Sequence, residues 1–181
     1  MSNEPAARTP GAKRAAPGEY VFDLGTVQKI MGGPAYSTAH GPCVEGDRMI
    51  VGLMRMKAGT GAEAHSHPNE QWIYVLEGTF HATIGGKEID VTPGSVVYIP
   101  ANTFHALRND SDHDIVFLTI WPQPTAPGDN GMHDERIKAW GAAFRVKAGC
   151  QVQETAQGVF VTEPDRHWNP LLPLPQPARI G

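Results

Sequence analysis

The chain has 181 residues, a formal net charge of −4 and two cysteines. This length suits one domain with a substantial hydrophobic core, and the acidic balance excludes the basic surface typical of nucleic-acid-binding proteins. No apolar run approaches the ~20 residues of a membrane-spanning helix, and two cysteines do not make a disulfide framework, so we expect a cytoplasmic protein without nucleic-acid or membrane partners.

The first nineteen residues are rich in Ala, Pro, Gly, Arg and Lys, and they contain no apolar stretch. Such a composition supplies neither a secretory signal nor a hydrophobic face to pack. We therefore expect residues 1–19 to form a disordered N-terminal arm.

Short strand patterns dominate the middle of the chain. They are rich in β-branched and aromatic residues, they are separated by turn residues, and Gly85-Gly86 predicts a hairpin turn. Several short strands at such spacing favour a β-sandwich or a closed barrel. The expected strands cover residues 49–57, 71–76, 79–84, 89–91, 95–99 and 115–121.

The composition changes after residue 124. Residues 133–146 place Ile137, Trp140 and Phe144 at helical spacing, which predicts a short helix packed on the outside of the domain or against a partner. Residues 164–181 contain five prolines and are expected to run extended. Because no internal repeat is visible, residues 20–163 are interpreted as one domain.

Two histidine blocks stand out within the strand region. The first runs from Gly59 through His65, His67 and Gln71 to Gly78. The second begins at Gly94 and ends at Asn109, and it contains Pro100, Asn102 and His105. On a strand, residues two apart point to the same side, so both imidazoles of the first block can meet one ion. Gln71 would approach from the next strand, and His105 would return from the facing sheet to close the site.

The paired blocks resemble the signature of the cupin superfamily, over about residues 45–122. The resemblance implies an all-β, cupin-type antiparallel β-barrel or jelly roll, here with a short C-terminal helix, and dimers are frequent among such proteins. It also implies one divalent transition-metal ion per chain, bound by His65, His67, Gln71 and His105. Three imidazoles suit Fe²⁺, which we favour, as well as Mn²⁺, Ni²⁺, Zn²⁺ or Cu²⁺.

Two positions depart from the family pattern. Gln71 stands where a glutamate is usual, and Asn102 stands where a glycine is usual. Glu70 is adjacent, but it fits the spacing less well than Gln71 and would face the opposite way on a strand. A neutral Gln71 in place of a glutamate leaves the ion its full positive charge and favours an anionic substrate. The alternative is that Gln71 marks a site with weakened metal affinity and a purely structural role.

The function most favoured by this reasoning is an Fe²⁺ dioxygenase that cleaves a C–C bond of a small oxygenated or aromatic compound. The alternatives are a redox-neutral isomerase or lyase acting on a sugar uronate or similar acid, and a non-catalytic small-molecule-binding protein. His81 and Tyr98 lie on central strands and could act as acid or base, although a structural hydrogen bond explains either residue equally well. The expected partners are an anionic or metal-chelating substrate and, as a homodimer, a second copy of the chain.

Overall fold

The computed structural model describes residues 7–33, 36–122, 151–155 and 158–162. Within these ranges the chain forms thirteen strands in two sheets, and no helix. The larger sheet comprises β1 (Lys13–Arg14), β2 (Lys29–Met31), β3 (His40–Glu45), β4 (Met49–Met56), β6 (Gln71–Glu77), β9 (Val96–Ile99), β11 (Ile115–Pro122), β12 (Gln151–Thr155) and β13 (Gly158–Thr162). The smaller sheet comprises β5 (Gly61–His65), β7 (Phe80–Ile84), β8 (Lys87–Val91) and β10 (His105–Arg108).

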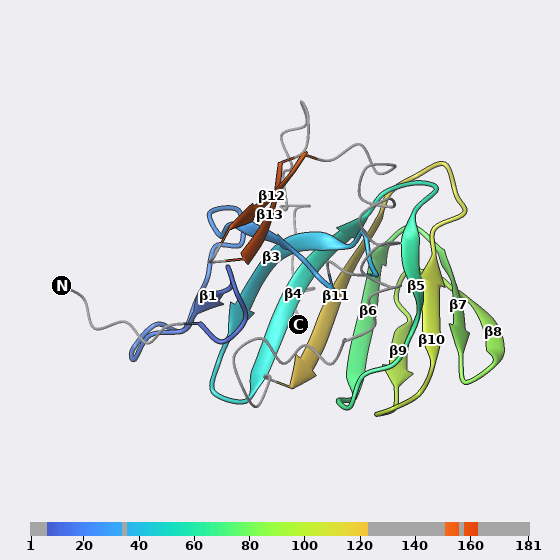
Figure 1. Ribbon diagram of the computed structural model, residues 1–181, viewed down its shortest axis with the longest axis horizontal. Coiled ribbons are helices and arrows are strands. Elements are labelled where there is room, and N and C mark those ends of the chain that lie inside the picture. The colour runs from blue at the N-terminus through green and yellow to red at the C-terminus, as the bar shows by residue number, and fades with distance from the viewer. Residues whose placement is uncertain (1–6, 34–35, 123–150, 156–157, 163–181) are drawn as a thin grey trace, which may run out of the picture.

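The strand order defines a two-layer sandwich. The larger sheet runs β12-β13-β2-β3-β4-β11-β6-β9, with β1 beside β3, and the smaller sheet runs β5-β10-β7-β8. Figure 1 shows β4, β11 and β6 side by side, with β7 and β8 at the far right of the molecule. All these pairings are antiparallel except that of β1 with β3.

The expected all-β fold is confirmed, but the closed barrel is not. The ladders leave β9 at one edge of the larger sheet and β5 and β8 at the two edges of the smaller sheet. One isolated bridge, between Ser37 and Ala62, connects the segment before β3 to β5. The described part of the chain is therefore a sandwich whose two layers face each other, rather than one continuous ring of strands.

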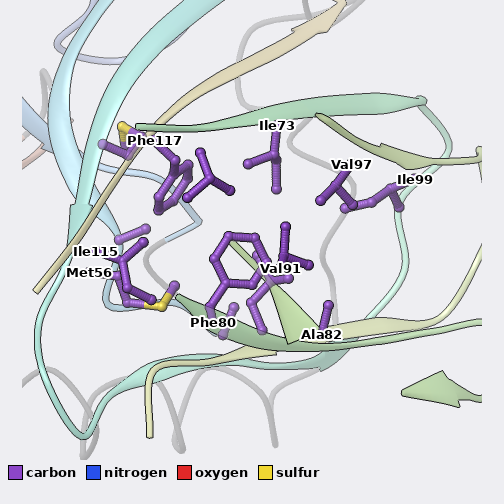
Figure 2. Packing of buried hydrophobic residues seen from close by; sticks show 14 of the residues in the cluster. Met56, Ile73, Phe80, Ala82, Val91, Val97, Ile99, Ile115 and Phe117 are labelled. Atoms are coloured by element: carbon purple, nitrogen blue, oxygen red, sulfur yellow. The ribbon is translucent and has the colours of Figure 1, made fainter. Parts of the chain in front are cut away.

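The core lies between the two sheets. Ile73 and Val75 on β6 are fully buried, and they face Phe80 and Ala82 on β7, which are 2% and 0% exposed. Figure 2 shows the Phe80 ring near the centre of this cluster, together with side chains from both layers. Each fully buried aliphatic or aromatic side chain contributes roughly 1.5–3 kcal/mol, so this layer supplies much of the stability.

The expected strands are all present, with ends that differ by a few residues, and Gly85-Gly86 forms the β7–β8 turn with φ of 56° and 78°. Two consecutive positive φ values are what a two-residue type I′ hairpin requires. Most of the strands that were not expected are short or poor in β-branched residues, although β13, with the sequence GVFVT, is not. β5, with the sequence GAEAH, is the clearest example, because it forms through pairing with β10 and not through its own propensity.

The structure describes the N-terminal arm from residue 7 onward. The backbone N–H groups of Arg8 and Thr9 donate to the carboxylate of Glu45 at 2.7 and 2.9 Å. Glu45 is fully buried, and the Arg14 guanidinium lies 3.7 Å from the same carboxylate. The arm thus contacts a buried acceptor that is distant in sequence, which composition does not reveal.

The helix expected at residues 133–146 and the tail at residues 164–181 lie outside the described residues. In the part of the chain that the structure describes, no helix is long and apolar enough to cross a membrane.

Candidate metal centre

Three histidines converge at one end of the smaller sheet. His65 ends β5, His67 follows in the turn to β6, and His105 begins β10 directly opposite His65 in the β5–β10 ladder. One ring nitrogen from each histidine lies within 4.8 Å of the other two. His105 therefore reaches the cluster from the neighbouring strand of the same sheet, and not from the facing sheet as expected.

Each of the three rings is oriented by a backbone carbonyl. The Nδ1 atoms of His65, His67 and His105 lie 2.5, 2.5 and 2.9 Å from the carbonyl oxygens of residues 63, 69 and 103, respectively. A carbonyl oxygen can only accept, so Nδ1 carries the proton in each ring and the lone pair is on Nε2. This is the arrangement that holds metal-binding histidines in other proteins.

The facing sheet contributes Gln71, the first residue of β6. Its Oε1 lies 3.1 Å from the Nε2 of His67, while its Nε2 donates to the Thr119 hydroxyl on β11 at 2.8 Å. Both Oε1 of Gln71 and Nε2 of His67 are then acceptors directed at each other, an arrangement that a cation between them would stabilise. The donor set thus fits a divalent metal ion of the kind that imidazole and amide oxygen bind.

Glu70 takes no part in this cluster. Its carboxylate accepts a hydrogen bond from the Tyr98 hydroxyl at 3.2 Å, and Glu70 is absent from the residues that line the site. The placement of Gln71 rather than Glu70 agrees with the spacing argument from the sequence, because neighbouring residues on a strand face opposite ways.

The surroundings of His65 and His105 favour the neutral form of their imidazoles. Burial, together with the neighbouring His105 and His67, lowers the pKa of His65 to about 3. Burial also lowers the pKa of His105 below its ordinary value. A neutral imidazole is the metal-binding form of histidine, so burial favours the metal-binding form of His65 and His105.

Asn102 connects the second histidine block to the first. Its backbone φ is 58°, and its N–H donates to the carbonyl oxygen of His67 at 2.8 Å. Asparagine tolerates this left-handed conformation better than most residues other than glycine. The departure from glycine at this position is therefore compatible with the loop geometry that places His105.

A cavity of about 310 Å³ opens beside the three histidines. Among the described residues that line it, Arg8 is the one with a full formal charge, and no carboxylate is present. Most of the wall is apolar, and its larger side chains are Ile30, Met31, Met54, Met56, Leu107, Phe117 and Trp121.

Tyr36 is a lining residue that sequence reasoning missed. Its ring lies 3.7 Å from that of His65, centroid to centroid, and burial raises the pKa of its phenol to about 12. The phenol end of the ring lies over Gly33, another lining residue, where a Cβ atom would lie 2.4 Å from the Tyr36 hydroxyl oxygen. No local pattern signals this residue, because the Ser37–Ala62 bridge brings its segment to the site.

The two residues expected as acid or base lie away from the cavity. His81 binds Asp90 at 2.8 Å on the outside of the smaller sheet, and Asp90 raises its pKa. Tyr98 is 45% exposed and stacks on Trp72 with ring centroids 4.5 Å apart. Neither residue lines the cavity; both lie on strands of the sandwich, but their side chains project from the outer faces.

Comparison with known proteins agrees with this arrangement. A family model for the cupin domain matches residues 52–121. An uncharacterized protein of Streptomyces coelicolor is 33% identical over 76 residues, which cover 42% of this chain and 71% of that protein. The polyketide synthase CurC of Streptomyces cyaneus is 28% identical over 106 residues, 58% of this chain and 68% of that one.

Solved structures also match. The polyketide cyclase RemF of Streptomyces resistomycificus superposes with a TM-score of 0.54 at 18% identity, over 71% of this chain and 97% of its own. This likeness shows a shared fold. A sugar phosphate isomerase structure from Acidithiobacillus ferrooxidans is 28% identical with a TM-score of 0.40, and the match covers 42% of this chain and about half (51%) of that one.

Proposed function

Because this chain belongs to the cupin superfamily, we propose that it is a metal-dependent enzyme acting on a largely apolar small molecule with an enolisable carbonyl or a phenol. The observation that carries the proposal is the cavity, in which three imidazoles and one amide oxygen adjoin a mostly apolar wall, and the described residues of that wall include no carboxylate. One barrel or sandwich hosts many chemistries, so the site and not the fold supports the assignment.

His65, His67, His105 and Gln71 would hold the ion, which when bound acts as a Lewis acid toward a substrate oxygen. Imidazole and amide groups bind a metal as neutral ligands, so a divalent ion would keep its charge and favour an enolate or phenolate over a neutral substrate. Tyr36, which burial keeps protonated, would donate a hydrogen bond to the substrate beside His65. The apolar walls would exclude water and orient the carbon skeleton.

The character of the wall decides between substrate classes. A sugar uronate needs hydrogen-bond partners for several hydroxyls, but several of the polar side chains in this wall already bind other protein groups. The Ser37 hydroxyl accepts from the N–H of Ala39 at 3.0 Å, and the Thr119 hydroxyl accepts from Gln71. The large side chains are Met, Ile, Leu, Phe and Trp, which favours an aromatic or polycarbonyl substrate.

The reaction that we favour is a redox-neutral cyclisation of a polycarbonyl compound. In such a step a carbon between two carbonyls loses a proton and bonds to a distant carbonyl carbon, and water leaves. Support comes from the apolar cavity and from the similarity to CurC, a polyketide synthase by name. The solved structure of RemF, a polyketide cyclase by name, shares the fold of this chain.

A dioxygenase is the second candidate, and one observation favours it. The described lining residues include no carboxylate that could serve as a general base. A dioxygenase that cleaves a C–C bond of a metal-chelating phenol or diketone depends less on a general base than the cyclisation does. Fe²⁺ would then be the favoured ion, because it can activate dioxygen.

The test uses protein loaded with Co²⁺, whose visible spectrum reports ligands at the metal. We expect pentane-2,4-dione to perturb the spectrum at concentrations at least tenfold below those needed for glucuronate. Equal or tighter binding of glucuronate would contradict the apolar-substrate proposal. Oxygen uptake with Fe²⁺-loaded protein then separates the two reactions, since a cyclase turns over a polycarbonyl substrate equally well under argon.

His105→Ala serves as the control for the metal centre. Bound metal should fall well below one equivalent in this variant, and the spectral response to pentane-2,4-dione should disappear with it. Retention of one full equivalent would remove His105 from the metal site.

A further inference from the structure

The cavity beside the three histidines is elongated across the strands of the larger sheet. In the ladder order β2-β3-β4-β11-β6, each of these five neighbouring strands contributes at least one lining residue. Because neighbouring strands lie ~4.8 Å apart, β2 and β6 are separated by roughly 19 Å along the sheet. A volume of about 310 Å³ that extends in this direction makes the cavity a narrow slot. One lining residue from each strand, in the same order, is Met31, Cys43, Met54, Trp121 and Gln71.

The metal centre lies at the β6 end of this slot. Gln71 is the first residue of β6, and its amide donates to the hydroxyl of Thr119 on the adjacent strand β11. The strand register runs from Thr119 to Gly52 on β4, and from Gly52 to Cys43 on β3. Three strand spacings, roughly 14 Å, therefore separate the strand of Gln71 from the strand of Cys43. A long substrate held by an oxygen at the metal centre would extend along the slot toward β3.

The N-terminal arm supplies a wall of the slot at β3. Arg8, Thr9 and Pro10 are consecutive residues, and all three line the cavity. The backbone N–H groups of Arg8 and Thr9 donate to different oxygens of the fully buried Glu45 carboxylate. Glu45 lies two residues beyond Cys43 on β3, and residues two apart on a strand face the same side. Glu45 therefore holds the arm on the cavity side of the larger sheet.

Polar contacts, more than apolar burial, hold this wall in place. Every residue from 7 to 29 keeps some solvent exposure, whereas Cys43 and Met54 in the floor of the slot are 0% and 1% exposed. The strand β1 pairs with β3 over only two residues (Figure 1), and the backbone carbonyl of Glu45 accepts from the N–H of Ala15 at 2.9 Å. Segments with few buried apolar contacts detach at a low cost in free energy. Glu45 is therefore the main anchor of the arm.

We propose that the N-terminal arm is part of the substrate site, and that Glu45 is a positioning residue that holds it there. This inference rests on the proposed function and specifies its substrate further. The substrate is long and flat, with chelating oxygens at the metal centre and apolar rings against Arg8, Thr9 and Pro10. The docked arm removes apolar surface of these rings from water, which stabilises the complex. A short diketone occupies the metal end of the slot alone and does not reach the arm.

The test compares two diketones on Co²⁺-loaded protein. Pentane-2,4-dione is the chelating head alone, and 1-(naphthalen-2-yl)butane-1,3-dione adds two fused rings to the same head. In Glu45→Gln an amide N–H₂ replaces one carboxylate oxygen and meets an N–H of the arm, so the arm undocks. We expect this variant to bind the naphthyl compound roughly tenfold more weakly than the wild type, and pentane-2,4-dione with affinity unchanged within about threefold. A tenfold change corresponds to the loss of cover over roughly 55 Å² of apolar ring surface.

Thr9→Pro tests the same contact without a change in the core. Proline lacks the backbone N–H that Glu45 accepts, and Thr9 lies in the partly exposed arm. This variant should lose affinity for the naphthyl compound as Glu45→Gln does. Thr9→Val keeps both the N–H and the shape of the side chain, and Glu88→Gln removes an exposed carboxylate on β8 of the other sheet. Both of these control variants should bind the two diketones like the wild type.

The two diketones separate a failure of this inference from a failure of the proposed function. If Glu45→Gln and Thr9→Pro are folded by circular dichroism and bind the naphthyl compound as tightly as the wild type, the arm is no part of the substrate site. An equal loss for both diketones would also overturn the inference, because Glu45 would then act on the metal centre, and so would a wild type that binds only pentane-2,4-dione. A wild type that does not bind pentane-2,4-dione would refute the proposed function, and this inference with it.

Discussion

Thr119→Val tests how the fourth ligand is held. The Thr119 hydroxyl is the acceptor for the Gln71 amide at 2.8 Å, and Thr119 is 3% exposed. Without it the amide N–H₂ loses its partner, and the amide can rotate to donate to the Nε2 of His67 instead. That rotation would occupy the His67 lone pair and withdraw the Gln71 oxygen from the metal site.

The loss of metal affinity expected for Thr119→Val can be estimated from comparable metal sites. Removal of a group that orients a metal ligand lowers affinity by about 10–100-fold, which corresponds to about 1.4–2.8 kcal/mol. Stability of the metal-free protein should change by no more than ~1–3 kcal/mol, the cost of one buried unpaired donor. The assay is competition with a chelator for Zn²⁺ or Co²⁺, with thermal unfolding of the metal-free protein measured in parallel.

Thr119→Ser provides the matched control, because it keeps the hydroxyl and should retain affinity within about threefold of the wild type. If Thr119→Val remains folded and binds the metal as tightly as Thr119→Ser, the hydrogen bond does not orient Gln71 for the metal. The assignment of Gln71 as a ligand would then need revision.

Three further predictions concern individual residues. Tyr36→Phe should lower turnover by about 100-fold, as loss of a proton-donating group does, with metal content unchanged; unaltered turnover would exclude a role for the phenol. Asn102→Val should lower the free energy of unfolding by ~1–2 kcal/mol because of its left-handed backbone, while Asn102→Gly should stay within ~0.5 kcal/mol in the same urea titrations. Asp90→Asn should lower the pKa of His81 in an NMR titration, since Asp90 raises it in the wild type, and an unchanged pKa would contradict the ion pair.

The positions of the three histidines were accessible from the sequence because their spacing encodes geometry. His65 and His67 lie two residues apart at the end of a strand, and Gln71 opens the next strand, so local pattern alone brings them close. His105 was assigned to the cluster through the second block, but its strand partner was misplaced. The pairing of β10 with β5 contains a register shift between His105 and Leu107. The amino-acid sequence of either strand gives no sign of this irregularity.

Tyr36 and the arm show where the sequence was insufficient. Tyr36 reaches His65 through one isolated bridge, and Arg8 reaches Glu45 across 37 residues. Contacts of this kind depend on the assembled tertiary structure, and single-sequence patterns report only local periodicity. The positions of His81 and Tyr98 outside the cavity have a related reason. Both alternate with core residues on their strands, but the sequence does not state which side of a sandwich faces the cavity.

The buried Glu45 also makes part of the cavity wall depend on a distant segment. Arg8 lines the cavity, and its backbone N–H is bound by Glu45 on β3, 37 residues further along the chain. Contacts at such sequence separation are the kind that slow folding. The wall that Arg8 supplies is complete only when the arm has docked on β3.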